Sequence, residues 1–198
     1  MQKLVIASNN KHKIKEIKTI LKPYFEEILS LKEINLVIEI EETGNTFYEN
    51  AFLKAQTVSK LCGLPALADD SGLMVEALNG LPGVYSARFA GEPCNDFENN
   101  YKLLRLMENI ENRRCKFVSD VVLYFLDGKT AKGQGECEGE LLRYFDGNGG
   151  FGYDPLFYCN DLGKSFGLAL QNEKDLVSHR FKALMELVKN LRGNKGEL

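Results

Sequence analysis

The sequence has no tryptophan, only five prolines and only two histidines among its 198 residues. Because His12 and His179 are the only histidines, a histidine-rich metal centre is excluded. A membrane-spanning helix needs a run of about 18 apolar residues, and no segment of the sequence is close to that length. The apolar stretch Leu4–Ala7 is also too short for a secretory signal, so we expect no association with a membrane.

Cysteine is scarce and scattered, with five residues and no Cys-x-x-Cys pair. An odd, dispersed set argues against a disulfide framework and against a zinc site. It is typical of reduced thiols in a cytoplasmic protein, where they pack as small apolar residues. The cysteines are Cys62, Cys94, Cys115, Cys137 and Cys159.

Excess charge of either sign is absent: Lys and Arg total 25, Asp and Glu total 28, and the formal net charge is −3. This balance argues against a protein that binds a nucleic-acid backbone, which requires clustered cations. It allows a small anionic ligand if cations are concentrated locally or a metal ion supplies them. With 44% hydrophobic and 27% charged residues, the composition is that of a globular protein, and the length predicts that residues 1–198 form one large domain or two small lobes that share a core.

The order of apolar segments and turn residues predicts an α/β fold with a mixed, twisted sheet flanked by helices. A capping box at Thr46 and Glu49 begins the second helix, and Asp127-Gly128 is a hairpin turn. The expected strands cover residues 4–7, 65–68, 115–126, 129–137 and 140–145, and the expected helices cover residues 11–22, 46–62, about 95–107 and 174–191.

Three short motifs match known sites only as strings. Gly147-x-Gly149-x-x-Gly152 resembles a dinucleotide fingerprint, but Pro155 follows at once and no helix begins there. Gly163-Lys164-Ser165 lacks the first glycine of a P-loop. Asp70-Ser71-Gly72 resembles an aspartic-protease triplet, but it occurs once, and that chemistry needs two carboxylates side by side.

The turn between the first strand and the first helix is a candidate anion site. A helix N-terminus offers free N–H groups and a positive dipole end, and Lys13 adds a full charge. The alternative is that Ser8 or Asn10 is only a helix N-cap. The candidate residues are Ser8, Asn9, Asn10, Lys11, His12 and Lys13.

Acidic pairs occur at Asp69-Asp70, where we expect a strand to end, and at Glu41-Glu42. Ligands bind at the carboxyl ends of strands in α/β sheets, and carboxylate oxygens suit Mg²⁺, which keeps its waters for substrate phosphates. The alternative is a solvated turn.

Aromatic and basic residues near the C-terminus suggest a base-binding surface. Phe151 and Tyr153 could stack on a base while Asp154 fixes its polar edges, although aromatic residues here are also compatible with a core. Lys174 and Ser178 lie four residues apart on an expected helix, whose simplest interpretation is a solvated face.

Taken in order, these segments resemble the inosine/xanthosine triphosphate pyrophosphatase family, which removes aberrant purine nucleotides. The resemblance runs from about Lys3 to Leu191, and the ordered set is specific although each motif alone is weak. Its motifs are Ser8-x-Asn10-x-x-Lys13, Glu41-Glu42-Thr43-Gly44, Glu49-Asn50-Ala51, Leu67–Leu73, Leu81–Arg88, Gly150–Pro155 and Ser178-His179-Arg180.

The resemblance implies an elongated fold with an active-site cleft between two lobes, usually in a homodimer. It implies Mg²⁺-dependent hydrolysis of purine nucleoside triphosphates such as ITP, dITP and XTP to the monophosphate and pyrophosphate. By position, Asp70 resembles the proton acceptor and a metal ligand, and Glu41 resembles a second metal ligand, with Glu42 adjacent.

The same resemblance assigns the substrate-binding residues. Ser8 to Lys13 resemble the triphosphate-binding turn, Ser71 lies beside the substrate, and Lys54 faces the phosphates. The residues that resemble the family's nucleoside pocket are Phe151, Gly152, Tyr153, Asp154, Lys174, His179 and Arg180. Donors from Arg180 or Lys174 would pair with a purine 6-oxo group and would be left unpaired by adenine.

Other functions stay open. A related pyrophosphatase would act on pyrimidine or modified nucleotides, and a nucleotide sensor would bind without turnover. A nucleic-acid-binding module fits the charge balance least.

Overall fold

The computed structural model describes residues 3–193, and the chain divides into two compact units. Unit 1 comprises the described residues up to Asp70, Ser119–Gly135 and those from Arg180 onward, and unit 2 comprises Ser71–Val118 and Glu136–His179. Among residues 3–193, no helix has both the length and the apolar character needed to cross a bilayer.

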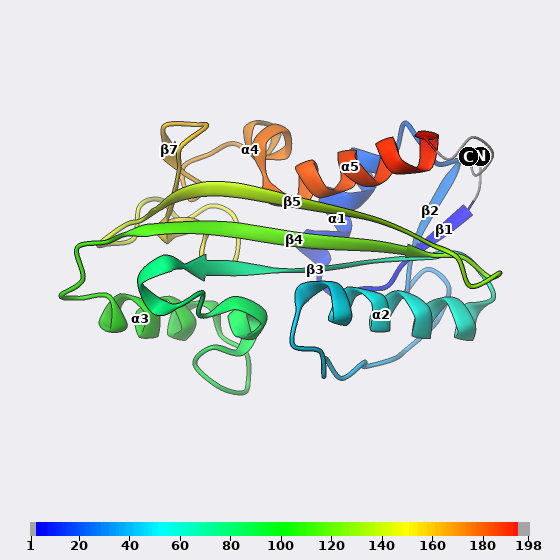
Figure 1. Ribbon diagram of the computed structural model, residues 1–198, viewed down its shortest axis with the longest axis horizontal. Helices are drawn as coiled ribbons and strands as arrows, with labels where there is room; N and C mark the ends of the chain where they lie inside the picture. Colours follow the sequence, from blue (N-terminus) through cyan, green and yellow to red (C-terminus); the bar gives the residue numbers. More distant parts are fainter. Residues whose placement is uncertain (1–2, 194–198) are drawn as a thin grey trace. The chain divides into compact units, whose positions relative to one another are not determined.

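A mixed seven-stranded sheet, in the order β2-β1-β3-β4-β5-β6-β7, forms the framework (Figure 1). Strand β1 pairs in parallel with β2 and β3, whereas β6 is antiparallel to β5 and β7. The predicted α/β class is therefore confirmed. The strands are β1 (Lys3–Ile6), β2 (Glu27–Ser30), β3 (Ala66–Val75), β4 (Arg114–Tyr124), β5 (Thr130–Leu141), β6 (Phe157–Cys159) and β7 (Lys164–Ser165).

The helices are α1 (Lys11–Leu21), α2 (Phe47–Cys62), α3 (Asp96–Leu106), α4 (Gln171–Val177) and α5 (His179–Gly193), with short 3₁₀ helices η1 (Glu76–Leu78), η2 (Gly83–Arg88) and η3 (Asp154–Leu156). Local chemistry explains two of the helix starts. The Asn10 side chain accepts hydrogen bonds from the first-turn amides of α1, and Thr46 and Glu49 form the predicted capping box of α2.

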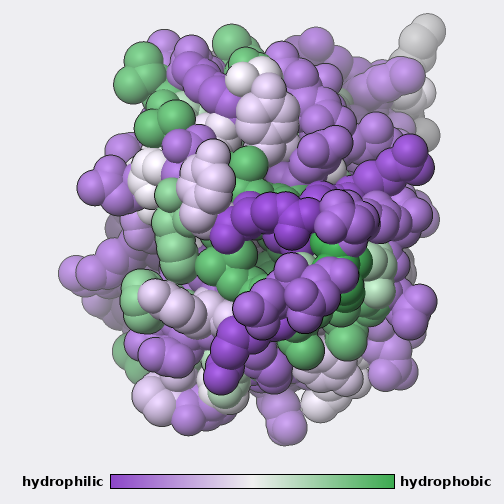
Figure 2. Space-filling model, turned by 90° about the vertical axis from the view of Figure 1, so that its left-hand side faces the viewer, coloured by the Kyte–Doolittle hydropathy of each residue, from purple (hydrophilic) through white to green (hydrophobic). Residues whose placement is uncertain are grey.

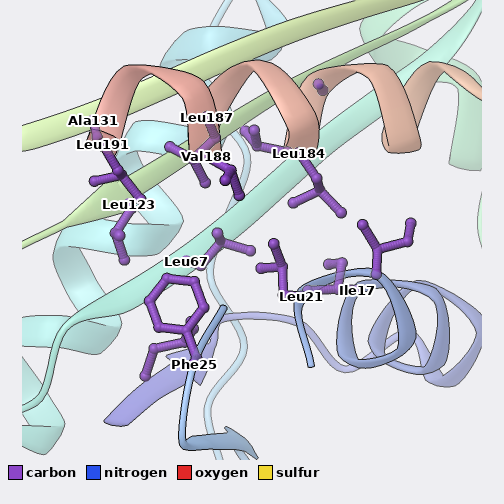
Figure 3. Packing of buried hydrophobic residues seen from close by; sticks show 14 of the residues in the cluster. Ile17, Leu21, Phe25, Leu67, Leu123, Ala131, Leu184, Leu187, Val188 and Leu191 are labelled. Atoms are coloured by element: carbon purple, nitrogen blue, oxygen red, sulfur yellow. The ribbon is translucent and has the colours of Figure 1, made fainter. Parts of the chain in front are cut away.

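In unit 1 the sheet is covered on both faces. Leu67 on β3 packs with Ile17 and Leu21 of α1 and with Leu184 and Leu187 of α5, as Figure 3 shows. The next residue, Ala68, belongs to a separate cluster with Ala51 and Ala55 of α2. Successive strand residues point to opposite faces, so α1 and α5 cover one face of β3 and α2 covers the other.

Gly133 allows α5 to lie close to β5 in unit 1. A Cβ atom at this position would lie 2.1 Å from the Ala183 carbonyl oxygen and 2.5 Å from the Leu187 nitrogen. Both atoms belong to the backbone, which cannot move aside as a side chain would. The absence of a side chain at residue 133 therefore sets the helix-to-sheet spacing here.

Unit 2 has its own apolar core, in which Leu103 of α3 and Met107, which follows this helix, pack with Leu73 and Val75 of β3 and with Phe157 of β6. Two sequence motifs meet at its edge: the Ser86 hydroxyl accepts a hydrogen bond from the Leu73 amide and donates one to the Gly83 carbonyl. A side chain at residue 72 would collide with Ser86, since its Cβ would lie 2.3 Å from the Ser86 Oγ atom.

Three predicted boundaries were wrong. The strand expected to end at Ala68 continues to Val75, so Asp69 and Asp70 lie within it. In place of the two strands expected at 129–137 and 140–145, one strand, β5, runs from Thr130 to Leu141, and residues 142–145 are not in a strand. The C-terminal helix expected at 174–191 is interrupted at Ser178, whose backbone is extended, and becomes α4 and α5.

Candidate active site

Asp69 and Asp70 are neighbours in the middle of β3, and both are buried. Because they follow Leu67 and Ala68 in an alternating strand, Asp69 faces α1 and α5, and Asp70 faces α2. Two consecutive carboxylates therefore enter different surroundings within unit 1.

Asp69 is held by cations. Its Oδ2 atom lies 2.7 Å from the Lys13 Nζ atom and 3.3 Å from the Arg180 NH2 atom, and its Oδ1 atom accepts a hydrogen bond from Ser119. Arg180 also bonds to the buried carboxylate of Glu16. Although burial opposes ionisation, Arg180 and Lys13 hold the pKa of Asp69 well below its usual value. These contacts favour the charged form of Asp69, which anchors α1, α5 and β4 to β3.

The pKa of Asp70 is shifted in the opposite direction from that of Asp69. Burial raises the pKa of its carboxyl, with a further contribution from Glu42, although Lys54 and Lys13 oppose the shift. Its Oδ1 atom lies 2.9 Å from the Lys54 Nζ atom, and its Oδ2 atom accepts a hydrogen bond of 3.3 Å from the Asn50 amide. A buried carboxylate with a raised pKa and both oxygens oriented is suited to accept a proton.

Side chains of α2 connect Asp70 to the loop that carries Glu41 and Glu42, which we call the acidic loop. Lys54 also lies 2.8 Å from Glu42, whereas Glu41 is exposed. One turn earlier, the Asn50 Oδ1 atom accepts a hydrogen bond of 2.8 Å from the Gly44 amide. Residues 50 and 54 share a helix face, so α2 holds this loop and Asp70 together.

The predicted anion-binding turn lies at the start of α1. Asn10 is its N-cap: the Oδ1 atom accepts hydrogen bonds from the amides of His12 and Lys13, at 3.0 and 3.1 Å. Ser8 accepts a hydrogen bond from the Asn10 amide. Asn9 donates a hydrogen bond to the Ile38 carbonyl. Lys11 and His12 are exposed, so this turn offers polar groups to solvent beside the ion pair of half-buried Lys13 with buried Asp69.

In unit 2, Lys174 and Asp154 form a buried ion pair with a separation of 2.6 Å. The same Asp154 Oδ2 atom accepts a hydrogen bond from the Phe151 amide, and Lys174 lies 4.6 Å from the centre of the Phe151 ring. Asp96 of α3 accepts a hydrogen bond from the Gly152 amide. The backbone at Phe151 and Gly152 is therefore held in place, and the half-buried Phe151 ring lies beside Lys174.

The remaining predicted residues are distributed between the units. Tyr153 is buried and donates a hydrogen bond to the Ser86 carbonyl, and the His179 ring stacks on Phe117 with centroids 4.7 Å apart, all in unit 2. Ser71 follows Asp70 on β3 and is half-buried. Arg180 bonds to Glu16 and Asp69 of unit 1.

The donor set is compatible with a magnesium ion. Among residues 3–193, no three His, Cys, Asp or Glu side chains converge on a metal position. Mg²⁺ does not require this, because it commonly takes one or two carboxylates and completes its shell with water and substrate phosphates. Asp70 and Glu42, which share Lys54 as a partner, supply such a pair of oxygen donors.

Comparison of this chain with known proteins identifies its family. The sequence profile of the Ham1 family matches residues 4–190. The chain belongs to the Ham1 family. Ham1 proteins from Staphylococcus aureus and Coxiella burnetii superimpose with TM-scores of 0.87 each, at 41% and 38% identity, and each covers 98% of this chain and 100% of the other.

Curated relatives of this Ham1 chain carry an enzyme name. The dITP/XTP pyrophosphatase of Desulforamulus reducens is 46% identical over 194 residues, covering 96% of both chains. The protein of the same name from Clostridium perfringens is 44% identical over 201 residues, covering 98% of both.

Sequence reasoning assigned no role to three residues that support this Ham1 site: Glu16, Asn50 and Ser119. Glu16 is a charged residue on an otherwise apolar helix face, and Ser119 is a polar residue within an apolar strand. Such isolated polar positions are the only signal for a buried network, and they do not name the partners. Asn50 stood inside a motif that had been recognised, but only the fold brings it to Asp70.

We expect Arg180→Ala to lower the free energy of unfolding by about 3–5 kcal/mol, because it leaves the buried carboxylates of Asp69 and Glu16 without their shared cation. Urea denaturation of both proteins measures this difference. Lys18→Ala is the matched control: it removes a partly exposed pair with Glu33 and should cost about 1 kcal/mol or less. Equal effects of the two substitutions would contradict the anchoring role of Arg180.

Proposed function

We propose that this protein hydrolyses non-standard purine nucleoside triphosphates, such as ITP, dITP and XTP, to the monophosphate and pyrophosphate. The observation that carries the proposal is Asp70: a buried carboxylate with a raised pKa, oriented by Lys54 and Asn50 beside the acidic loop of Glu42. The names of the curated relatives support the same substrate class.

In the proposed reaction, Asp70 accepts a proton from the water that attacks the α-phosphorus, and pyrophosphate leaves. Its two oxygens are already oriented, so one can receive the proton without reorganisation of the site. Lys13, the Ser8–Lys13 turn and Lys54 provide the positive charge and polar groups that hold the phosphates. A positioned base of this kind contributes roughly 10²–10⁴ to the rate.

Magnesium is the proposed cofactor. Asp70 and Glu42 would hold it, with Glu41 as the neighbouring candidate, and when bound it would neutralise phosphate charge and polarise the bond that breaks. An acidic protein repels a triphosphate unless such a cation compensates, which supports the requirement.

The base-binding residues are proposed in unit 2. Phe151 offers a half-buried ring for stacking, and the Lys174–Asp154 pair beside it offers a donor and an acceptor. Between the two candidate donors to a purine 6-oxo group, we favour Lys174, because it lies 4.6 Å from the centre of the Phe151 ring, whereas Arg180 bonds to Glu16 and Asp69 in unit 1. Adenine would leave this buried cation facing an amino group, which disfavours ATP.

We expect hydrolysis of ITP, dITP and XTP to exceed that of ATP, GTP, dTTP and UTP by at least about 10²-fold in kcat/KM when magnesium is present. Chromatographic detection of the monophosphate and pyrophosphate measures both the rate and the bond that is cut. EDTA should abolish the activity and excess magnesium should restore it.

The same panel separates the alternatives. Preferential turnover of pyrimidine nucleotides would replace the purine proposal by a related pyrophosphatase. Tight binding of ITP with magnesium but without product would favour a sensor.

We expect Asp70→Asn to lower kcat about 10²–10⁴-fold while the protein stays folded. The raised pKa of Asp70 indicates that its site tolerates a neutral group, so an amide of the same size should fit. Circular dichroism and steady-state kinetics with ITP test both parts. Asp127→Asn, in the exposed β4–β5 turn, should leave both unchanged. Near-normal turnover by folded Asp70→Asn would remove this residue from the reaction.

We also propose that the protein forms a homodimer. Phe97, Tyr101 and Phe145 of unit 2 contact one another while 57%, 46% and 37% exposed. Figure 2 presents a face of the molecule on which hydrophobic residues lie between hydrophilic side chains. Clustered exposed aromatic residues are typical of association surfaces.

Sedimentation equilibrium should therefore give twice the chain mass of 22.3 kDa. The double variant Phe97→Ser/Tyr101→Ser should shift the protein to the monomer. A monomeric wild-type protein at micromolar concentration would contradict the dimer, and a dimeric double variant would exclude this surface.

A further inference from the structure

Two buried thiols face each other in unit 2, and neither belongs to the residues assigned to catalysis or substrate binding. The Sγ atoms of Cys137, on β5, and Cys159, on β6, lie 3.5 Å apart, and neither residue is exposed. Both belong to the apolar core of this unit. The contact joins residues 22 apart in the sequence, so it depends on the pairing of the two strands.

The strand register explains why the thiols meet. In the antiparallel pair β5–β6, Cys159 lies opposite Gly139, which has no side chain. Cys137 is two residues from Gly139 and therefore points to the same face of the sheet. The thiol of Cys159 thus reaches diagonally to Cys137. A disulfide needs an S–S distance of about 2.05 Å, so the sulfur atoms must approach by roughly 1.5 Å.

The surroundings of Cys159 and of Cys115 shift the pKa values of these two thiols in opposite directions. The hydrogen bond with Cys137 lowers the pKa of Cys159 to about 7, with help from the amides of Leu162 and Asp161, although burial opposes the shift. Burial raises the pKa of Cys115, in the same core, to about 12. Thiolate is the reactive form, so Cys159 is the more reactive of these two residues.

We propose that Cys137 and Cys159 are an oxidisable dithiol that a peroxide converts to an intramolecular disulfide. The Cys159 thiolate attacks one oxygen of hydrogen peroxide, breaks the O–O bond and becomes a sulfenic acid, while the released hydroxide takes up a proton. The Cys137 sulfur then attacks the Cys159 sulfur, the S–O bond breaks and, with the Cys137 proton, water leaves. Two thiols and one peroxide thereby give one disulfide and two waters.

Access to the pair depends on the edge of the sheet. Strand β6 has three residues and β7, the last strand in the sheet order, has two. Asn160, which follows Cys159, is exposed. Short strands at an edge open locally at low cost, and hydrogen peroxide is small enough to enter through such an opening.

Hydrogen peroxide titration of the reduced, full-length protein tests the proposal without reference to its enzymatic activity. After oxidation, remaining thiols are alkylated in denaturant and the protein is digested for mass spectrometry. We expect a peptide pair linked through Cys137 and Cys159, the loss of alkylation at both of these thiols, and its recovery at both with dithiothreitol. Cys115 should stay alkylatable, and exposed Cys94 indicates when the peroxide dose is sufficient.

Two variants complete the test. Cys159→Ser should abolish the linked peptide, whereas Cys115→Ser, the matched buried control, should retain it. Alkylation of both Cys137 and Cys159 at a dose that oxidises Cys94 would overturn the proposal. Their conversion to sulfinic acids without a linked peptide would overturn it as well. Because mapping the wild-type protein is decisive alone, an unfolded variant does not weaken the test.

Discussion

The charge of Asp69 inside the sheet is the constraint on which unit 1 depends. A buried carboxylate is stable only where cations and hydrogen-bond donors replace its water. This requirement is met by Lys13 from α1, Arg180 from α5 and Ser119 from β4. The buried carboxylate of Glu16 pairs with Arg180, so the two cations of this group face two carboxylates. Three elements that are distant in the sequence are therefore fixed around one side chain.

The same strand separates structure from chemistry by alternation. Asp69 faces two cations and stays ionised, whereas Asp70, one residue later, faces α2 and has a raised pKa. Two identical side chains thus acquire different properties from the opposite faces of one strand, a general way in which proteins divide roles between neighbouring carboxylates. Lys13 connects the two, since it is bonded to Asp69 and its charge also acts on Asp70.

Features that depend on a few neighbouring residues were predictable. The capping box at Thr46, the Asp127-Gly128 turn and the amphipathic helix after Lys11 all match the structure, because each is determined within one turn of backbone. The end of β3 was not predictable: Asp69 and Asp70 are typical of a turn and remain in a strand only because Lys13, Arg180 and Lys54 meet them there. The break at Ser178 was missed because the apolar spacing continues across it.

The sequence by itself determined the α/β class, the order of the motifs and the residue types available for phosphate and metal chemistry, because these follow from periodicity and from side-chain identity. Only the tertiary structure decided which partners meet. It joined Glu42, rather than Glu41, to Asp70 through Lys54, bonded Arg180 to Asp69 and Glu16, and paired Cys137 with Cys159. The physical reason is that a side chain's charge state depends on burial and on neighbours from distant segments, which no local pattern records.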